Sequence, residues 1–288
     1  MLSVAKYGED RFVEVEGYKI HYVEAGAGEP VILIPGSWST YRAWNRIIPL
    51  LSDYYRLLAL DYVGTGDSDK PKKGFRYTVQ EQANLTAKMI EKLELGRVHL
   101  IGGSYGGAIV LYLSAQYPDL VNKVVSIEGG VVRPEELPGS PMEFLLKYPV
   151  MGDLFIGIGK TGLLDKVIAR LVAGKWYAHM TSDDRKELLE QISYNTKSAS
   201  RIPWYWIGIS HKTCEDFEEA ARLMKVPVLY LYGEESDFMK MLLEENIRFL
   251  ETYLPSARVV GLEGGIHDLA FQKPKEVAHL ILDFFGEG

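Results

Sequence analysis

A serine flanked by glycines is the feature of this chain best suited to chemistry. The segment 102–106, Gly-Gly-Ser-Tyr-Gly, follows the apolar run Val98–Ile101 and precedes a stretch of helical periodicity over Ala108–Tyr117. This pattern predicts a strand, a sharp turn and a helix, with the Ser104 hydroxyl held away from the sheet. Glycines two positions before and after the serine are expected because the strand and helix backbones pass too close for a Cβ. The segment therefore predicts a nucleophile elbow.

A serine hydroxyl attacks only when a base removes its proton, and a carboxylate must fix the tautomer of that base. His267 follows the predicted strand Arg258–Leu262 and precedes the predicted closing helix Pro274–Phe285. It therefore belongs on a loop at the carboxyl edge of the sheet, where open α/β sheets bind ligands. We predict that His267 is the base. The other histidines lie in predicted strands (His21 and His99), inside the closing helix (His279) or in a long helical segment (His179 and His211).

The elements that would hold these side chains alternate along the chain. Two stretches of alternating polarity predict an N-terminal hairpin around Gly17, namely Phe12–Val15 and Lys19–Glu24. Continuous apolar runs typical of strands buried in a parallel sheet occur at Val31–Ile34, Leu57–Leu60, Val98–Ile101, Val124–Ile127 and Val228–Tyr232. Helical periodicity occurs at Trp44–Leu51, Thr78–Leu93, Ala108–Tyr117 and Leu242–Tyr253.

The segment 131–211 interrupts this alternation and contains only helical patterns, such as Leu163–Val172 and Asp183–Tyr194. Thr181 and Asp184 are spaced as a capping pair for the second of these helices. We therefore expect one core domain formed by residues 1–130 and 212–288, with residues 131–211 inserted as a helical cap. The cap is rich in large apolar residues, which predicts an apolar cleft above the sheet edge or a core of its own.

Composition excludes several classes of protein. The chain has 288 residues, 47% of them apolar, which suits a globular protein with a substantial core. Its net charge of −7 argues against nucleic acid or an anionic membrane as a partner, because binding phosphates needs a basic face. Cys214 is the only cysteine and the N-terminus lacks the apolar region of a signal peptide, so we expect a cytoplasmic protein. The sequence contains neither a set of residues spaced as metal ligands nor a cofactor motif. It does not determine whether the protein is a monomer or a homo-oligomer.

Together these features resemble the α/β-hydrolase superfamily over essentially the whole chain. The segment 35–38, Pro-Gly-Ser-Trp, is similar to the oxyanion loop of that family, which usually reads His-Gly. The segment 61–68 is similar to its D-x-x-G-x-G-x-S motif, and Gly265-Ile266-His267 is similar to its histidine region. The resemblance implies an α/β-hydrolase fold, with a mostly parallel eight-stranded sheet flanked by helices and an inserted helical cap.

The same resemblance implies the surroundings of the reacting carbon. The oxyanion would be stabilised by the backbone N–H groups of Ser37 and Tyr105, and Gly36 and Trp38 would line the substrate pocket. Pro35 replaces the usual histidine, which we expect to change the packing of the loop and to leave the oxyanion hole intact.

Two carboxylates compete for the role of the acid. Most serine members carry an aspartate three residues after the glycine that ends the penultimate strand, but here Ser236 is third after Gly233 and Asp237 comes one residue later. Glu128 ends the strand Val124–Ile127, where some relatives carry their acid. A carboxylate at the end of an apolar strand needs a partner to offset its burial, whereas Asp237 could be an ordinary turn residue. We favour Glu128 and keep Asp237 as the alternative.

The serine also limits the reaction. Dehalogenases and epoxide hydrolases attack with a carboxylate and form an ester that water can cleave, whereas Ser104 would form a stable ether. We therefore expect acyl transfer to water, with a small ester carrying an apolar acyl or aryl group as the substrate. The alternatives are a carbon–carbon bond hydrolase or lactonase with the same residues, and a ligand-binding protein of hydrolase fold without useful turnover.

Overall fold

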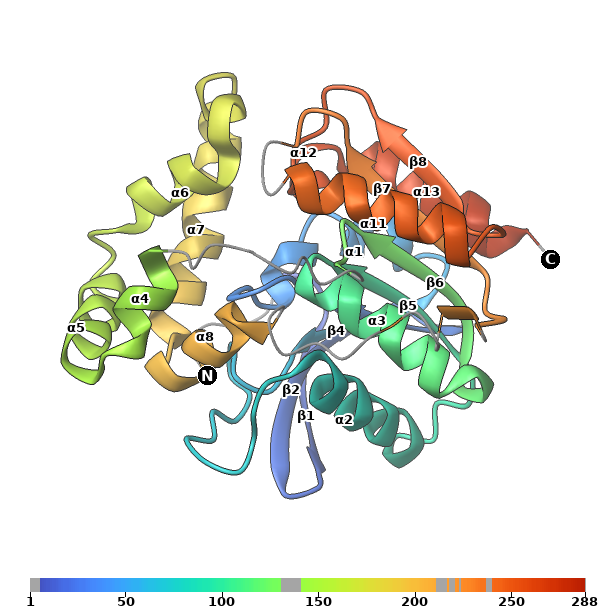
Figure 1. The fold of residues 1–288 in the computed structure, drawn as a ribbon, viewed down its shortest axis with the longest axis horizontal. Coiled ribbons are helices and arrows are strands. Elements are labelled where there is room, and N and C mark those ends of the chain that lie inside the picture. The colour runs from blue at the N-terminus through green and yellow to red at the C-terminus, as the bar shows by residue number, and fades with distance from the viewer. Residues whose placement is uncertain are drawn as a thin grey trace.

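The fold is built on one twisted sheet with helices on both faces (Figure 1). The computed structural model describes residues 6–130, 141–210, 217, 221–222, 224–236 and 240–287. Within these residues the sheet has eight strands in the order β1-β2-β4-β3-β5-β6-β7-β8. The strands are β1 (Glu9–Val15), β2 (Tyr18–Ala25), β3 (Pro30–Ile34), β4 (Arg56–Asp61), β5 (Val98–Gly103), β6 (Val121–Ile127), β7 (Val228–Gly233) and β8 (Arg258–Leu262).

The strand directions confirm the mostly parallel sheet expected from the sequence. Strands β1 and β2 pair antiparallel, with Val15 opposite Tyr18, and β2 pairs antiparallel with β4. The hairpin turn is tight because Glu16 and Gly17 both have positive φ, 52° and 80°. All pairings from β4 through β3 to β8 are parallel. The carboxyl ends of the central strands therefore meet at one edge.

The apolar runs are continuous because the central strands are buried on both faces. In β3, Ile32 and Ile34 pack into one apolar cluster, while Val31 and Leu33 pack into another. Helices α2 (Val79–Lys92) and α3 (Tyr105–Gln116) contribute side chains to the first cluster, and α11 (Lys240–Tyr253) adds Leu250. Helices α1 (Ile48–Leu51) and α13 (Pro274–Gly286) contribute to the second. The sheet is therefore the middle layer of three.

The helices predicted over Trp44–Leu51 and Ala108–Tyr117 differ from the observed ones for identifiable reasons. The helix expected over Trp44–Leu51 is wrong in its first half, since a 3-10 turn covers Tyr41–Trp44 and α1 begins only at Ile48. Pro49 explains the break, because its ring clashes with the carbonyl four residues earlier in any longer helix. Helix α3 begins at Tyr105, three residues earlier than its apolar periodicity indicates.

The described residues between β6 and β7 are helical or irregular. Helices α4, α5 and α6 lie on the side of the molecule farthest from β8, and α7 and α8 lie nearer the sheet (Figure 1). The capping box of α7 is confirmed, because the Thr181 side chain and the Asp184 side chain each bind the other's backbone N–H. Both predicted cap boundaries fall beside undescribed residues, so the division into core and cap stays a prediction. The helices are α4 (Pro141–Lys147), α5 (Pro149–Lys160), α6 (Asp165–Ala173), α7 (Ser182–Ser198) and α8 (Arg201–Gly208).

Candidate active site

Ser104 lies in a strained turn between the end of β5 and the start of α3. Its backbone has φ 50° and ψ −115°, a combination that L residues rarely adopt and that costs about 1–3 kcal/mol. The turn is held by a hydrogen bond of 2.8 Å from the Ser104 N–H to the carbonyl of Ile127 in β6. Strain of this kind persists only where the surrounding structure enforces it. The backbone here has the geometry that the nucleophile-elbow prediction requires.

The flanking glycines explain how the turn fits. A Cβ on Gly102 would lie 2.2 Å from the carbonyl oxygen of Gly106. A Cβ on Gly106 would lie 2.1 Å from the carbonyl oxygen of Ile34 and 2.6 Å from that of Pro35. No real Cβ approaches a backbone oxygen so closely. Glycine at both positions therefore allows α3 to pass against β5 and β3.

His267 contacts Glu128 across the edge of the sheet. The imidazole Nδ1 forms a hydrogen bond with Glu128 Oε2, although the two residues are 139 positions apart. Because the carboxylate accepts this bond, Nδ1 carries the hydrogen and Nε2 is left with a lone pair that can take a proton. The Glu128 side chain is 3% exposed and that of His267 is 26% exposed. The base candidate therefore reaches solvent while its carboxylate partner is buried.

The buried carboxylate of Glu128 has two further donors. The backbone N–H of Gly233 donates to Oε1 at 2.8 Å, and the Ser236 hydroxyl donates to Oε2 at 2.9 Å. Glu128 itself has a positive φ of 50°, and its N–H donates to Leu231 at 2.9 Å. These bonds supply the partners that a carboxylate at this depth needs.

Ser236 is the residue whose role sequence reasoning missed. It occupies the position, third after Gly233, where most serine relatives were expected to carry an aspartate. In this chain that position contributes a donor to Glu128 instead. The missing aspartate was itself the available signal, since a small hydroxyl residue there leaves space for an acid from the neighbouring strand. Asp237, the alternative acid, lies outside the described residues.

The loop after β3 reaches the nucleophile. A Cβ built on Gly36 would lie 3.3 Å from the Cβ of Ser104, and the Tyr62 hydroxyl donates to the Gly36 carbonyl at 2.9 Å. Tyr105 is the first residue of α3, and the first N–H groups of a helix have no acceptor within the helix. Gly36 therefore lies beside Ser104, and Tyr105 directly follows it. Ser37, the other oxyanion candidate, is the residue after Gly36 in this loop.

Trp38 connects this loop to the helical segment. Its indole N–H donates to the carbonyl of Trp204 in α8 at 2.8 Å, and the two ring centroids are 6.0 Å apart. Its φ is +59°, so the loop turns sharply at this residue. Trp204 and Leu146 are buried in a cluster of the segment itself, against which Trp38 packs. Through Trp38, the loop after β3 therefore contacts α8 of the helical segment.

His21 forms a separate buried cluster. Its Nδ1 bonds to Asp61 at 2.7 Å and its Nε2 bonds to Asp10 at 3.0 Å, and the residue is fully buried. Burial alone would lower the pKa of His21. The hydrogen bonds and charges of the two aspartates raise it by more than burial lowers it, so the pKa of His21 lies above its ordinary value. Asp61 also accepts the backbone N–H groups of Tyr41 and Asp67. The cluster therefore holds together the loops that follow β3 and β4.

Among the described residues, no group of three or more histidine, cysteine, aspartate or glutamate side chains is arranged to hold a metal ion. Nor is any helix of the described chain both long enough and apolar enough to span a bilayer.

Comparison with known proteins agrees with this architecture. A family model described as alpha/beta hydrolase fold matches residues 29–155. The soluble epoxide hydrolase of Corynebacterium sp. (strain C12) is 25% identical over 94% of this chain and 95% of its own length. The 2-hydroxy-6-oxo-6-(2'-aminophenyl)hexa-2,4-dienoic acid hydrolase of Metapseudomonas resinovorans is 36% identical, over 40% of this chain and 41% of its own. The enol-lactonase structure from Burkholderia xenovorans LB400 superposes with TM-score 0.78 at 20% identity, covering 96% of this chain and 100% of that one.

The sheet and these comparisons define the class at the level of the fold: the chain has the α/β-hydrolase fold. The two relatives named above are an epoxide hydrolase and a dienoic acid hydrolase, so hydrolase activity is what these comparisons support.

Proposed function

We propose that this protein hydrolyses carboxylic esters through an acyl-enzyme formed on Ser104. The observation that carries the proposal is the hydrogen bond between His267 and Glu128, since it orients an imidazole at the sheet edge that also bears the elbow. A buried carboxylate bound to Nδ1 leaves Nε2 as the acceptor for a serine proton. These are the requirements of nucleophilic catalysis by serine.

The proposed reaction has two halves. The Ser104 Oγ attacks the ester carbonyl while His267 takes the proton of the serine hydroxyl. The resulting oxyanion accepts hydrogen bonds from the backbone N–H groups of Ser37 and Tyr105. The tetrahedral species collapses to an acyl-serine, and His267 returns the proton to the departing alcohol. Water then attacks the acyl-serine by the same route and releases the acid. Each oxyanion donor contributes typically about 3 kcal/mol of transition-state stabilisation.

The serine makes epoxide hydrolysis a poor match despite the full-length relative of that name. An epoxide opened by Ser104 would leave an alkyl ether, which His267 and water cannot cleave. An acyl-serine is hydrolysable, so the chemistry of the nucleophile supports a carbonyl substrate. The helical segment, with Trp38 and Trp204 packed together beside the loop, supports an apolar acyl or aryl group on that substrate.

A second candidate is hydrolysis of a carbon–carbon bond in a vinylogous diketone. It is favoured by the 36% identical relative, which is a 2-hydroxy-6-oxo-6-(2'-aminophenyl)hexa-2,4-dienoic acid hydrolase. The same nucleophile and base would serve, with the proton delivered to carbon in place of oxygen.

A substrate panel on the parent and on Ser104→Ala tests the proposal. We expect hydrolysis of p-nitrophenyl butyrate by the parent and a loss of about 10⁴-fold or more in kcat for Ser104→Ala. Ser182→Ala, at an exposed position in α7, is the matched control and should retain full activity.

Three outcomes would change the assignment. Turnover of a ring-fission dienoate well above that of the ester would favour the second candidate. Stoichiometric labelling of Ser104 by a fluorophosphonate without steady-state turnover would indicate a binding protein of hydrolase fold. Ester hydrolysis that survives in Ser104→Ala would refute the proposal.

A further inference from the structure

Exposed apolar side chains gather on helices α4 to α6. Among the described residues, twelve large apolar side chains are exposed, and all except Tyr54 belong to residues 144–206. Single exposed apolar residues are normal on a protein surface, but successive helices that each leave a row of them in water indicate an interaction site. We call the following set the outer face: Val150, Leu154, Ile158, Leu163, Val167 and Leu171.

The outer face follows from the periodicity of its helices. Val150, Leu154 and Ile158 recur every four positions and share one side of α5, and Val167 and Leu171 share one side of α6, which Leu163 precedes in the turn between the helices. The opposite sides carry buried residues, such as Ile156 in α5 and Ala169 in α6, and both helices pack on α7. Val150, Leu163 and Leu171 are 82%, 75% and 76% exposed. The folded chain therefore leaves a strongly apolar side of two helices in water.

The charge of this region is opposite to that of the whole chain. Residues 141–175 contain five basic and three acidic side chains, whereas the chain carries a net charge of −7. Two of the acids, Glu143 and Asp165, are buried, and the third, Asp153, pairs with Arg201 at 3.0 Å. The basic side chains are all exposed: Lys147, Lys160, Lys166, Arg170 and Lys175.

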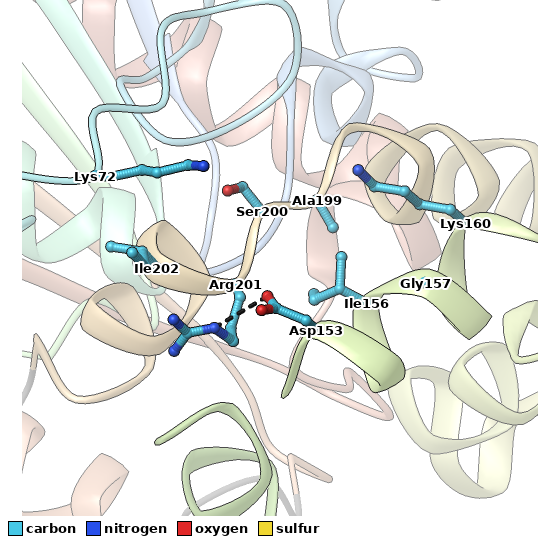
Figure 2. A pocket seen from close by; sticks show the side chains of 9 residues that line it. All are labelled: Lys72, Asp153, Ile156, Gly157, Lys160, Ala199, Ser200, Arg201 and Ile202. Carbon is cyan, nitrogen blue, oxygen red and sulfur yellow. Dashed lines mark hydrogen bonds and ion pairs between the residues drawn. The ribbon is translucent and has the colours of Figure 1, made fainter. Parts of the chain in front are cut away.

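A pocket of about 440 Å³ lies between α5 and the start of α8, on another side of α5 than Val150, Leu154 and Ile158. Lys72 and Lys160 line it and extend toward the chain at Ala199 and Ser200 from opposite sides (Figure 2). Neither lysine Nζ forms a hydrogen bond or ion pair with another residue in the described parts of the chain. With Arg201 neutralised by Asp153, the pocket carries two uncompensated positive charges. Such a pocket suits a phosphate group.

We propose that the outer face docks on an anionic lipid surface, with a lipid phosphate held in the pocket between Lys72 and Lys160. Apolar side chains of an interfacial helix enter the acyl region, while basic side chains at the rim bind the headgroups. A second copy of this chain fits less well, because two such faces would bring like charges together. The net charge of −7 argues against an anionic membrane partner for the chain as a whole, whereas this proposal depends on the local excess of basic side chains in residues 141–175.

Sedimentation of the full chain with vesicles tests this inference. We expect binding to vesicles of mixed phosphatidylcholine and phosphatidylglycerol, with about tenfold less on pure phosphatidylcholine or in about 0.5 M salt. The double variant Leu163→Ser/Leu171→Ser should lower the bound fraction about tenfold, while Tyr54→Ser, which removes an exposed aromatic elsewhere, should not. Lys72→Gln/Lys160→Gln should weaken binding to the anionic vesicles only.

Each contrary result has a defined meaning. Equal binding to both kinds of vesicle, or no effect of the leucine substitutions, would overturn the inference. A dimer that light scattering detects in the parent and not in Leu163→Ser/Leu171→Ser would assign the face to a second copy. Displacement of the protein by free inorganic phosphate alone would reduce the pocket to a phosphate site unrelated to lipid. Vesicle binding does not depend on turnover, so its failure is distinct from failure of the proposed function.

Discussion

Replacing Glu128 by glutamine is the sharpest test of the site. The carboxylate now accepts three hydrogen bonds, from Gly233, Ser236 and His267. The amide has one oxygen, which can keep the bond from Gly233, while its NH₂ would face the imidazole. An NH₂ is a donor, so His267 would have to accept at Nδ1 and carry its hydrogen on Nε2. In that tautomer the nitrogen facing the substrate cannot take a proton.

The magnitude follows from this tautomer. Comparable changes in serine enzymes cost about 10⁴-fold in kcat, equivalent to about 5.4 kcal/mol of transition-state stabilisation. The buried bonds lost by the carboxylate cost about 1.5–3 kcal/mol each in stability, so Glu128→Gln should fold with a lower free energy of unfolding. We expect kcat to fall 10³- to 10⁴-fold with KM little changed.

The assay should report on the serine as well as on turnover. Steady-state hydrolysis of p-nitrophenyl butyrate gives kcat, and the rate of fluorophosphonate labelling of Ser104 gives its nucleophilicity without assuming a substrate. Asp237→Asn is the matched control and should change neither rate more than about tenfold. Loss of 10³-fold or more in Asp237→Asn, with Glu128→Gln within tenfold of the parent, would refute the assignment of the acid.

Three further predictions concern the scaffold. Ser236→Ala removes one bond from Glu128 and should lower kcat and the labelling rate about tenfold with KM unchanged; a change in KM alone would contradict a positioning role. Gly106→Ala forces a Cβ to within 2.1 Å of a backbone oxygen and should lower the free energy of unfolding in urea by more than about 2 kcal/mol. The control Gly157→Ala, where a Cβ meets nothing within 4 Å, should be neutral or stabilising. The raised pKa of His21 stabilises the fold fully below about pH 6.5, and this contribution is lost as pH rises through the folded-state pKa. Urea denaturation should therefore show a larger difference between the parent and His21→Gln at pH 6 than at pH 9, and an equal difference would contradict the charged pairing.

Local pattern was enough to predict most of the fold. The periodicity of apolar residues predicted every strand of the sheet within a few residues, including β8 at Arg258–Leu262. It failed over Trp44–Leu51, where helical spacing was present but Pro49 prevents a continuous helix. The periodicity also missed the first turn of α3, because Tyr105 to Gly107 are constrained by the elbow and not by an apolar stripe.

By itself, the sequence determined the elbow at Ser104 and the loop that carries His267, since both depend on short segments whose residue types dictate the local backbone. The competition between Glu128 and Asp237 could not be resolved in that way. Each follows the end of a parallel strand, and only the pairing of β6 with β7 and of β7 with β8 brings the Glu128 carboxylate to the imidazole, with Ser236 as a second donor. The outer face likewise emerged only in three dimensions, because burial against α7 decides which apolar residues of α5 and α6 are left in water.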